Sequence, residues 1–258
     1  MEGVLPGGLT NAGSIVRVGD VIVRPASPYS ETVHAVLRHV RAKGFHAVPE
    51  PIAIIDGREH VSYVEGDSLT EEWPTGPHAD ATLASASRLL RRFHDATRDF
   101  VAPDGVRWNP DLADPEVGDV ICQGDPCLGN MTFADGLAVG MFDFEYMAPG
   151  RAATDLGSFI RQSIPLVPAH RVTGALDPIR LIVLAAEAYG GLTPEEVVGG
   201  FETASEVADR LWHGRLAARD PVFTAKWQEL DQGERIRQRW RWLEEHRGQL
   251  LDALELTQ

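Results

Sequence analysis

Three residues with oxygen-bearing side chains follow short apolar segments in the middle of the chain. Asp125 and Asn130 are separated by four residues, and they come after an apolar run that ends at Cys122. Asp143 follows a second apolar run, over residues 137–142. Carboxylate and amide oxygens are the ligands that magnesium prefers in proteins. The spacing therefore indicates a site where cation ligands gather at two strand ends.

This set of side chains is what phosphoryl transfer by the kinase route requires. One carboxylate orients the attacking hydroxyl and can take its proton, while an Asn and a second carboxylate hold the magnesium ions that bridge the phosphates. The protein-kinase pattern has the same D-x-x-x-x-N spacing, followed by the aspartate of D-F-G, and here that second part reads Asp143-Phe144-Glu145. Taken singly, such residues more often cap turns, so it is their joint spacing that favours a catalytic interpretation.

Residues 121–156 resemble the aminoglycoside phosphotransferase and choline kinase superfamily. The motif of that family is H-G-D-x-x-x-x-N, then I-D-F/W-D/E, then a Gly and D-L-A, and this chain reads QGDPCLGN, FDFEYMAPG and TDLG. The resemblance implies a two-lobed protein-kinase-like fold of the α+β class. It also implies a role for each matching residue: Asp125 as catalytic base, Asn130 and Asp143 as Mg²⁺ ligands, Glu145 as a further acid that assists a metal, and Asp155 as the brace of the catalytic loop.

Three departures from the family pattern bear on activity. Gln123 stands where the family has a His that orients the loop, and a Gln side chain can still form hydrogen bonds. Arg24 stands where the family has a phosphate-binding lysine, and its guanidinium offers a permanent charge in a bidentate fork. The helix acid that pairs with that lysine is missing at the expected turn, where Val33 and His34 stand and Glu31 is the nearest acid. These changes leave open a weakened kinase or a non-catalytic binder.

The N-terminal part supplies candidate nucleotide contacts. The Gly-rich stretch 7–14, which includes Gly13 and Ser14, resembles a loop that holds phosphates through backbone N–H groups. Tyr63 and Val64, in YVEGDSL, resemble the hinge where an adenine would meet the backbone. The resemblance therefore implies ATP or GTP as co-substrate, with Mg²⁺ as cofactor.

Residues 1–66 are expected to form a small nucleotide-binding lobe. Gly19-Asp20 and Asp56-Gly57 separate β-branched runs, which predicts two hairpins. Between them, Ser27 is predicted as a helix N-cap and Gly44 as the stop of the same helix. The apolar residues of that helix recur at i, i+3, i+4 and i+7, so it is expected to pack one face on a sheet.

Residues 67–258 are expected to form the larger lobe, which would hold the catalytic residues and the acceptor. The polar, Pro- and Gly-rich residues 67–78 suggest a crossing into it. From Thr154 onward the pattern is helical, and Thr193-Pro-Glu-Glu196 has the form of a capping box. The site segment forms the short hairpin inside this mainly helical part.

The composition and net charge limit the classes of partner that are expected. The chain has 258 residues and a formal net charge of −14. Such a surface repels nucleic acid and anionic membranes, so neither is expected as a partner, and it suits a cationic small-molecule acceptor. No signal-peptide pattern or membrane-length apolar run is present, so the expected location is the cytoplasm. Cys122 and Cys127 match no zinc pattern and are predicted as reduced thiols.

The sequence as a whole predicts an ATP- or GTP-dependent O-phosphotransferase. The acceptor would be a hydroxyl of an antibiotic, an amino alcohol or a related metabolite. The alternative is a non-catalytic kinase-like protein that binds nucleotide or ligand in an immunity or regulatory role. The joint presence of Asp125, Asn130 and Asp143 favours the enzyme. The identity of the acceptor, the choice between ATP and GTP and the oligomeric state stay open at this point.

Overall fold

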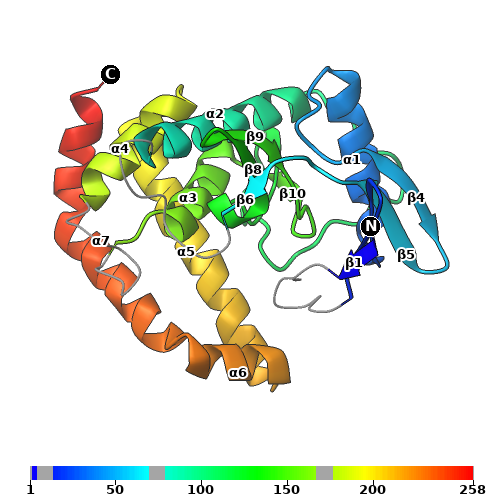
Figure 1. Cartoon of the computed structure of the whole chain (residues 1–258). Helices are drawn as coiled ribbons and strands as arrows, with labels where there is room; N and C mark the ends of the chain where they lie inside the picture. Colours follow the sequence, from blue (N-terminus) through cyan, green and yellow to red (C-terminus); the bar gives the residue numbers. More distant parts are fainter. Residues whose placement is uncertain (1, 5–13, 70–78, 167–176, 258) are drawn as a thin grey trace.

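The computed structural model describes residues 2–4, 14–69, 79–166 and 177–257. A small antiparallel sheet with one helix lies beside a larger part that is mostly helical (Figure 1). This is the α+β, kinase-like arrangement that the site motif predicts.

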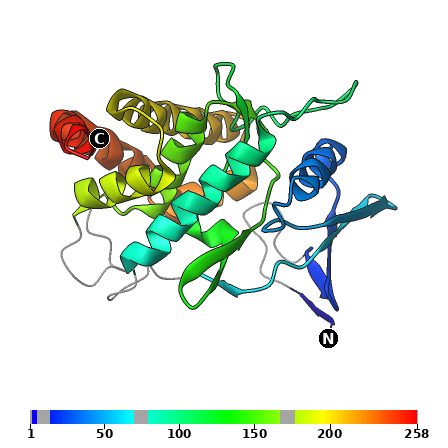
Figure 2. The same cartoon turned by 90° about the horizontal axis from the view of Figure 1, so that it is seen from above.

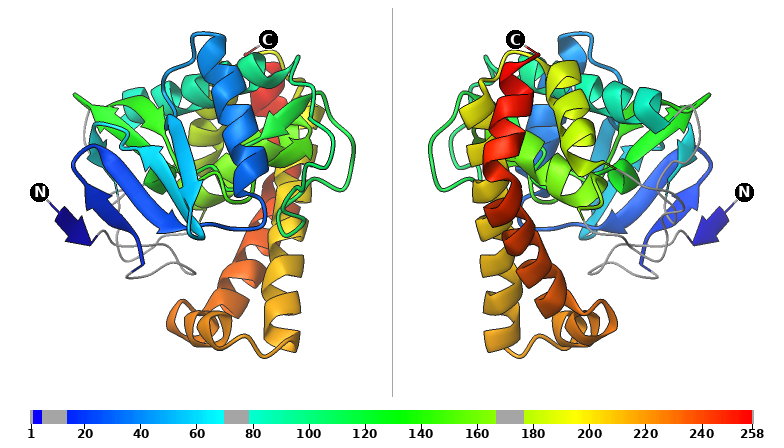
Figure 3. Two further views of the ribbon diagram at one scale, coloured as in Figure 1. Left: turned by 90° about the vertical axis from the view of Figure 1, so that its right-hand side faces the viewer. Right: turned by 90° about the vertical axis from the view of Figure 1, so that its left-hand side faces the viewer.

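The N-terminal sheet has five strands in the order β1-β2-β3-β5-β4. Their bounds are β1 (Glu2–Val4), β2 (Val16–Val18), β3 (Val21–Pro25), β4 (Pro51–Ile55) and β5 (Arg58–Ser62). Both predicted hairpins are confirmed, because β2 pairs with β3 across Gly19-Asp20 and β4 pairs with β5 across Asp56-Gly57. Helix α1 (Ser30–Ala42) packs beside this sheet (Figure 3) and contacts β4.

Helix α1 begins later than the sequence predicts. The Ser27 hydroxyl accepts a hydrogen bond from the Tyr29 N–H at 3.1 Å, and the Ser30 hydroxyl accepts one from the Ser27 N–H at 3.0 Å. These bonds form a turn ahead of the helix, so Ser27 does not cap it directly. The predicted stop is confirmed, because Gly44 has a φ of +85° and its N–H donates to the Arg41 carbonyl.

The larger part opens with short strands around a helix. Its first elements are β6 (Asp67–Ser68), α2 (Ala79–Thr97), β7 (Val120–Cys122), the 3₁₀ turn η1 (Leu128–Asn130), β8 (Met131–Ala134), β9 (Leu137–Met141) and β10 (Ala148–Gly150). β6, β8 and β9 form one sheet, and β7 pairs with β10. Helix α2 lies between the N-terminal sheet with α1 and the remaining helices (Figure 2), so it connects the two parts.

Five helices complete the larger part. They are α3 (Ala152–Ser163), α4 (Pro178–Tyr189), α5 (Pro194–Ala217), α6 (Pro221–Glu229) and α7 (Gln232–Glu255). The predicted capping box at Thr193 and Glu196 is confirmed by two reciprocal hydrogen bonds. Helices α3 and α5 pack backbone to backbone, since a Cβ added at Gly157 would lie 2.3 Å from backbone atoms of Gly200. The C-terminal end of α5, helix α6 and the N-terminal end of α7 extend away from the body of the molecule (Figure 1).

One hydrophobic core runs through both parts. It contains buried side chains of α1, α2, β7–β9, α3, α4, α5 and α7. Both cysteines are free thiols, as the sequence predicts, and Cys122 belongs to this core. Within the described ranges, no helix is both long enough and apolar enough to cross a membrane.

Candidate active site

The loop after β7 carries Asp125 and is held in place by hydrogen bonds. The backbone N–H groups of Gln123 and Gly124 donate to the two oxygens of the Asp155 carboxylate, at 2.7 Å and 2.9 Å. Gly124 has a φ of +91°, and a Cβ there would lie 2.2 Å from the Tyr146 carbonyl oxygen, so glycine is required. The backbone that presents Asp125 is therefore fixed by α3 on one side and by the Tyr146 segment on the other.

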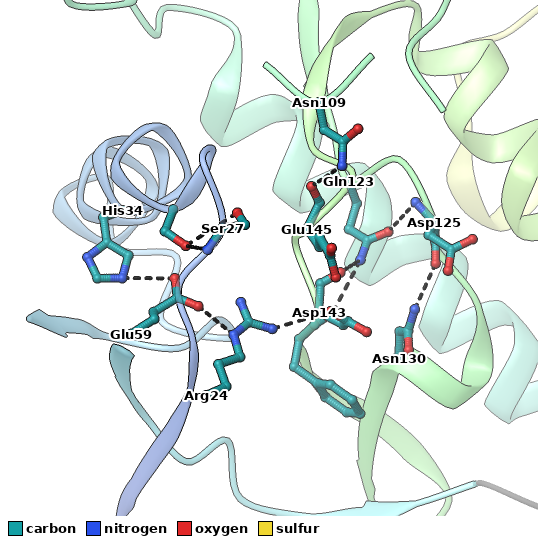
Figure 4. Close-up of polar contacts among 12 residues, drawn as sticks. Arg24, Ser27, His34, Glu59, Asn109, Gln123, Asp125, Asn130, Asp143 and Glu145 are labelled. Atoms are coloured by element: carbon teal, nitrogen blue, oxygen red, sulfur yellow. Dashed lines mark hydrogen bonds and ion pairs between the residues drawn. The ribbon is translucent and has the colours of Figure 1, made fainter. Parts of the chain in front are cut away.

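Gln123 connects the Asp125 loop to the strand end that carries Asp143. Its side-chain carbonyl accepts from the Asp125 N–H at 2.8 Å, and its amide nitrogen donates to the Asp143 carbonyl at 2.6 Å (Figure 4). The side chain is fully buried. A glutamine can therefore make, at this position, the bridging contacts expected of the residue that orients the loop.

Asn130 and Asp143 supply the oxygen atoms that suit a magnesium ion. The Asn130 side-chain nitrogen donates to the Asp125 carbonyl at 2.9 Å, which leaves its amide oxygen as the atom to bind a cation. Asp143 has a φ of +60°, a strained conformation of the kind that gathers at functional sites. Among the described residues, no group of three His, Cys, Asp or Glu side chains is assembled as a metal site. Two protein oxygens nevertheless fit magnesium, which usually completes its shell with substrate phosphates and water.

Arg24 reaches this site from the N-terminal sheet. Its Nε donates to the Glu59 carboxylate, and its Nη1 lies 3.3 Å from Oδ1 of Asp143 (Figure 4). Although burial opposes the charged form, Glu59 and Asp143 raise the pKa of Arg24 above its ordinary value. The guanidinium is thus held as a cation directly beside a candidate metal ligand.

Glu59 supplies the acid that sequence reasoning did not find. Arg24 and Glu59 are register partners on β3 and β5, so their side chains lie on the same face of the sheet. Glu59 is 1% exposed, and its Oε1 lies 3.0 Å from Nε2 of His34 on α1. Burial alone would raise its pKa, but the contacts with His34 and Arg24 hold it below its usual range. The helix thus contributes a histidine at the turn where an acid was expected, and the acid comes from a strand.

Asp125 has the electrostatic properties of a general base. Burial, with a further effect of the nearby Asp143 charge, raises the pKa of Asp125 to about 6, although Arg161 on α3 opposes the shift. Its Oδ1 accepts a hydrogen bond from the Gln162 side chain at 2.7 Å. A carboxylate with a pKa near neutrality is well suited to accept a proton from a hydroxyl.

The structure gives contacts for two other predicted site residues, Glu145 and Ser14, whose proposed roles stay predictions. The Glu145 carboxylate lies close enough to Arg24 to raise its pKa, and the Glu145 carbonyl accepts from the Asn109 side chain at 3.0 Å. Ser14 precedes β2, where its carbonyl accepts from Arg58 at 3.0 Å. Gly13 and the rest of the Gly-rich stretch lie outside the described residues.

Tyr63 and Val64 lie apart from these groups. Both line an open groove of about 470 Å³, whose other walls come from the segment after α1 and from the β8–β9 hairpin. The Arg17 guanidinium stacks over the Tyr63 ring, with 3.5 Å between its Cζ and the ring centroid. Neither Arg24 nor Asp143 borders this groove, so adenine contact at Tyr63 and Val64 stays a prediction.

His94 has a larger part in the site than its helical position suggested. Its Nε2 lies 2.8 Å from Oδ2 of Asp155, and its Nδ1 lies 2.7 Å from the Tyr189 hydroxyl. His94 and Asp155 are both buried. The brace of the catalytic loop therefore extends through α2 to α4.

Known proteins resemble this chain in sequence and in fold. No protein-family model matches the chain. A trifolitoxin immunity protein from Rhizobium leguminosarum bv. trifolii is 34% identical over 156 residues, which span 57% of this chain and 58% of that protein. The chain thus matches less than two thirds of the length of this relative.

Solved structures share the whole fold. A choline/ethanolamine kinase family protein from Mesorhizobium loti superposes with a TM-score of 0.61 at 21% identity, over 97% of this chain and 91% of that one. The GDP complex of aminoglycoside 2'-phosphotransferase-IIIa gives a TM-score of 0.57 at 14% identity, over 91% of this chain and 92% of that one. The chain therefore has the kinase-like fold of the choline kinases and aminoglycoside phosphotransferases.

Proposed function

We propose that the protein is a magnesium-dependent small-molecule O-phosphotransferase that uses ATP or GTP. The observation that carries this proposal is the convergence of Arg24, Asn130 and Asp143 beside the loop of Asp125. A phosphate-binding cation, two cation ligands and a base of suitable pKa are the parts that kinase-type phosphoryl transfer requires. The fold, which it shares with phosphotransferases, supports the same function.

In the proposed reaction, each residue acts at a definite atom. The Asp125 carboxylate orients the acceptor hydroxyl and takes its proton as the acceptor oxygen bonds to the γ-phosphorus. The bond from that phosphorus to the β–γ bridging oxygen breaks, and the nucleoside diphosphate leaves. Arg24 binds phosphate oxygens and offsets their charge. Asn130 and Asp143 would hold the Mg²⁺, which neutralises the phosphates when it is bound.

A second candidate function is a non-catalytic binder with an immunity or regulatory role. Two observations favour it. The guanidinium of Arg24 contacts Asp143 itself, so a predicted metal ligand already has a cationic partner. The relative from Rhizobium leguminosarum bv. trifolii carries the name of an immunity protein. An immunity role and catalysis are also compatible, since phosphorylation of a toxin or antibiotic would protect the cell.

The two candidates differ in turnover. The purified chain is incubated with ATP or GTP and MgCl₂, together with a panel of aminoglycosides, amino alcohols, sugars and other hydroxyl compounds. An enzyme transfers the γ-phosphate to at least one acceptor, and Asp125→Asn abolishes most of this transfer. Nucleotide binding without transfer to any acceptor would favour the binder. Absence of magnesium-dependent nucleotide binding at millimolar concentration would contradict the enzyme and leave only a binder of a ligand other than nucleotide.

A further inference from the structure

A second guanidinium lies beside the candidate base on the side of α3. Among the charges that act on Asp125, the one on Arg161 is the largest that stabilises the ionised carboxylate. Reciprocally, Asp125 is the charge that most favours the cationic form of Arg161 against the cost of burial. Arg161 lies on α3, six residues beyond Asp155, which holds the Asp125 loop. Its position is therefore set by the same helix that holds the loop.

Arg161 has no ion-pair partner within the part of the chain that the structure describes. No carboxylate oxygen there lies within 4.0 Å of its guanidinium nitrogens, and its Nε is buried without a hydrogen-bond acceptor. Charged groups that leave water are normally paired, because an uncompensated buried charge is strongly destabilising. The Arg161 guanidinium therefore has no anionic partner among the described residues.

The two carboxylates that act on Arg161 are already engaged elsewhere. Oδ1 of Asp125 accepts from Gln162 at 2.7 Å. Asp209 on α5 forms an ion pair with Arg239 on α7, and its other oxygen accepts from the Trp240 indole at 2.7 Å. Arg239 adds a second positive charge near Arg161. Neither acid is therefore available to neutralise Arg161 by a direct contact.

Arg161 also lines a narrow crevice at the junction of the catalytic loop, α3 and α5. Gly124 and Tyr146 form one wall, and Ala204 and Val207 of α5 form another. Asp114, which is paired with Arg151, and Asp155, which is bonded to His94 and the loop amides, also border it. The crevice has a volume of about 10 Å³, which is room for about one water molecule. A carboxylate or phosphate group is too large to enter this crevice, so an acceptor would have to meet the guanidinium from outside it.

We infer that Arg161 binds an oxyanion of the acceptor, so that the substrate is a hydroxyl compound with a carboxylate or phosphate group near the hydroxyl. This inference rests on the proposed phosphotransferase function. It opposes the expectation, drawn from the net charge of −14, that the acceptor is a cation. The charge of Arg161 next to Asp125 matters more for the acceptor than the net charge of the chain, because an ammonium group placed beside Arg161 would be repelled.

The competing role for Arg161 is to position Asp125 and tune its proton affinity. That role predicts an equal effect on every acceptor, whereas anion binding predicts an additional loss that is confined to the anionic ones. Four probes share one three-carbon skeleton with hydroxyl groups: glycerol, 3-aminopropane-1,2-diol, glycerate and glycerol 3-phosphate. They carry a neutral, a cationic, a carboxylate and a phosphate end respectively, so the two last probes separate the two sources of oxyanion.

The experiment compares wild type with Arg161→Met, and uses Arg235→Met, an exposed position on α7, as the matched control. We expect kcat/KM in wild type to be at least about tenfold higher for glycerate or glycerol 3-phosphate than for glycerol, as for hydrogen bonds to charged groups. Arg161→Met should remove this preference. Because it also removes the charge that most favours ionised Asp125, the pH profile should shift upward by the same amount for all four probes, and the rates are compared on the plateau above that shift. Equal losses for all four probes, or a preference for the cationic probe, would overturn the inference.

A second measurement does not need turnover. Thermal melting is followed with glycerate or glycerol 3-phosphate against NaCl of equal ionic strength, in the presence of Mg²⁺ and a non-hydrolysable ATP analogue. The anions should raise the melting temperature of wild type and Arg235→Met but not of Arg161→Met. If wild type shows no shift beyond the salt control, or if Arg161→Met shows the same shift, the anion site does not exist. If the shift is selective for wild type but no acceptor is phosphorylated, the phosphotransferase proposal fails and the anion site stands.

Discussion

Arg24 of the N-terminal sheet and Asp143 of the larger part meet across the site, with Nη1 3.3 Å from Oδ1. The first is the candidate phosphate ligand and the second is a candidate magnesium ligand. Magnesium-bound phosphates that enter between them would give each side chain a new partner of opposite charge. The contact therefore occupies the place where the nucleotide is expected. The proposed roles of both residues can be tested by measuring nucleotide binding.

Substitution of Arg24 should affect nucleotide binding first. Arg24→Ala removes the guanidinium that Glu59 and Asp143 hold at the site. We expect the Kd for the magnesium–nucleotide complex to rise at least about tenfold, which is the loss of one charge-assisted contact. Arg24→Lys should recover only part of it, because lysine lacks the planar fork. Isothermal titration calorimetry provides the measurement. Arg38→Ala, at an exposed position on α1, should bind as wild type does. Unchanged binding by Arg24→Ala would remove Arg24 from the site.

Glu59 should act by positioning Arg24. Glu59→Gln leaves Arg24 and His34 without their buried carboxylate, so we expect a loss of stability of roughly 3 kcal/mol in urea unfolding. Because the pKa of Glu59 is lowered in the fold, its contribution is present above the pKa of the unfolded chain and is lost as the pH falls below it. The gap in stability between wild type and Glu59→Gln should therefore narrow on acidification. A gap that is constant with pH would show that the charge of Glu59 does not stabilise the fold.

Asp125 should set the pH dependence of turnover. Its pKa of about 6 predicts that kcat/KM rises with pH through about 6, as the base loses its proton. Asp125→Asn should lower kcat by roughly 10²-fold or more and abolish this limb, while nucleotide affinity stays within a few-fold of wild type. Because a raised carboxyl pKa means that the charged form is disfavoured in the fold, Asp125→Asn should also melt no lower than wild type at pH 8. A clear fall in melting temperature would instead identify Asp125 as a structural residue.

Substitutions of Asp143 and Asn130 should differ from substitution of Asp125 in their effect on magnesium-dependent nucleotide binding. In wild type, ATP or GTP with Mg²⁺ should raise the melting temperature far more than nucleotide or Mg²⁺ alone. We expect Asp143→Asn and Asn130→Ala to lose most of this shift, because each removes one predicted metal ligand. Asp252→Asn, at an exposed position on α7, is the control for the loss of one acid. If both site variants keep the full magnesium-dependent shift, the metal is held elsewhere.

Asp155 should be needed for the fold itself. Its buried carboxylate accepts from two loop amides and contacts His94. Asp155→Asn replaces one acceptor oxygen by a donor that faces a backbone N–H, so we expect a destabilisation of roughly 2–4 kcal/mol in urea unfolding. Asp135→Asn, in the exposed β8–β9 turn, should change stability little. A small effect at Asp155 would mean that the loop is held by its remaining contacts.

The hairpins, the helices and the catalytic segment were predictable because their signals are local. The turn pairs at residues 19–20 and 56–57, the stop at Gly44 and the capping box at Thr193 each depend on residues within a few positions. The spacing of Asp125, Asn130 and Asp143 is likewise a short-range pattern. These features use only the chemistry of neighbouring residues, so one sequence suffices to find them.

The contacts that the sequence did not reveal join residues that are far apart along the chain. Glu59 meets Arg24 because two hairpins bring β3 and β5 together, although 35 residues separate them. The two strands belong to different hairpins, and the register between hairpins is not set by any short sequence signal. His94 meets Asp155 across 61 residues and Tyr189 across 95, and no short pattern announces either contact. Arg161 was missed because its significance depends on the partners that it lacks.

The two loop amides that donate to Asp155 have a consequence for the history of this site. Amides that are bonded to a buried carboxylate exchange with deuterium only when the surrounding structure opens. Gln123 and Gly124 should therefore exchange about as slowly as the core helices, although they lie in a loop. A loop this rigid tolerates little sequence drift. In the proposed phosphotransferase, changes of acceptor specificity are then expected in segments outside this loop.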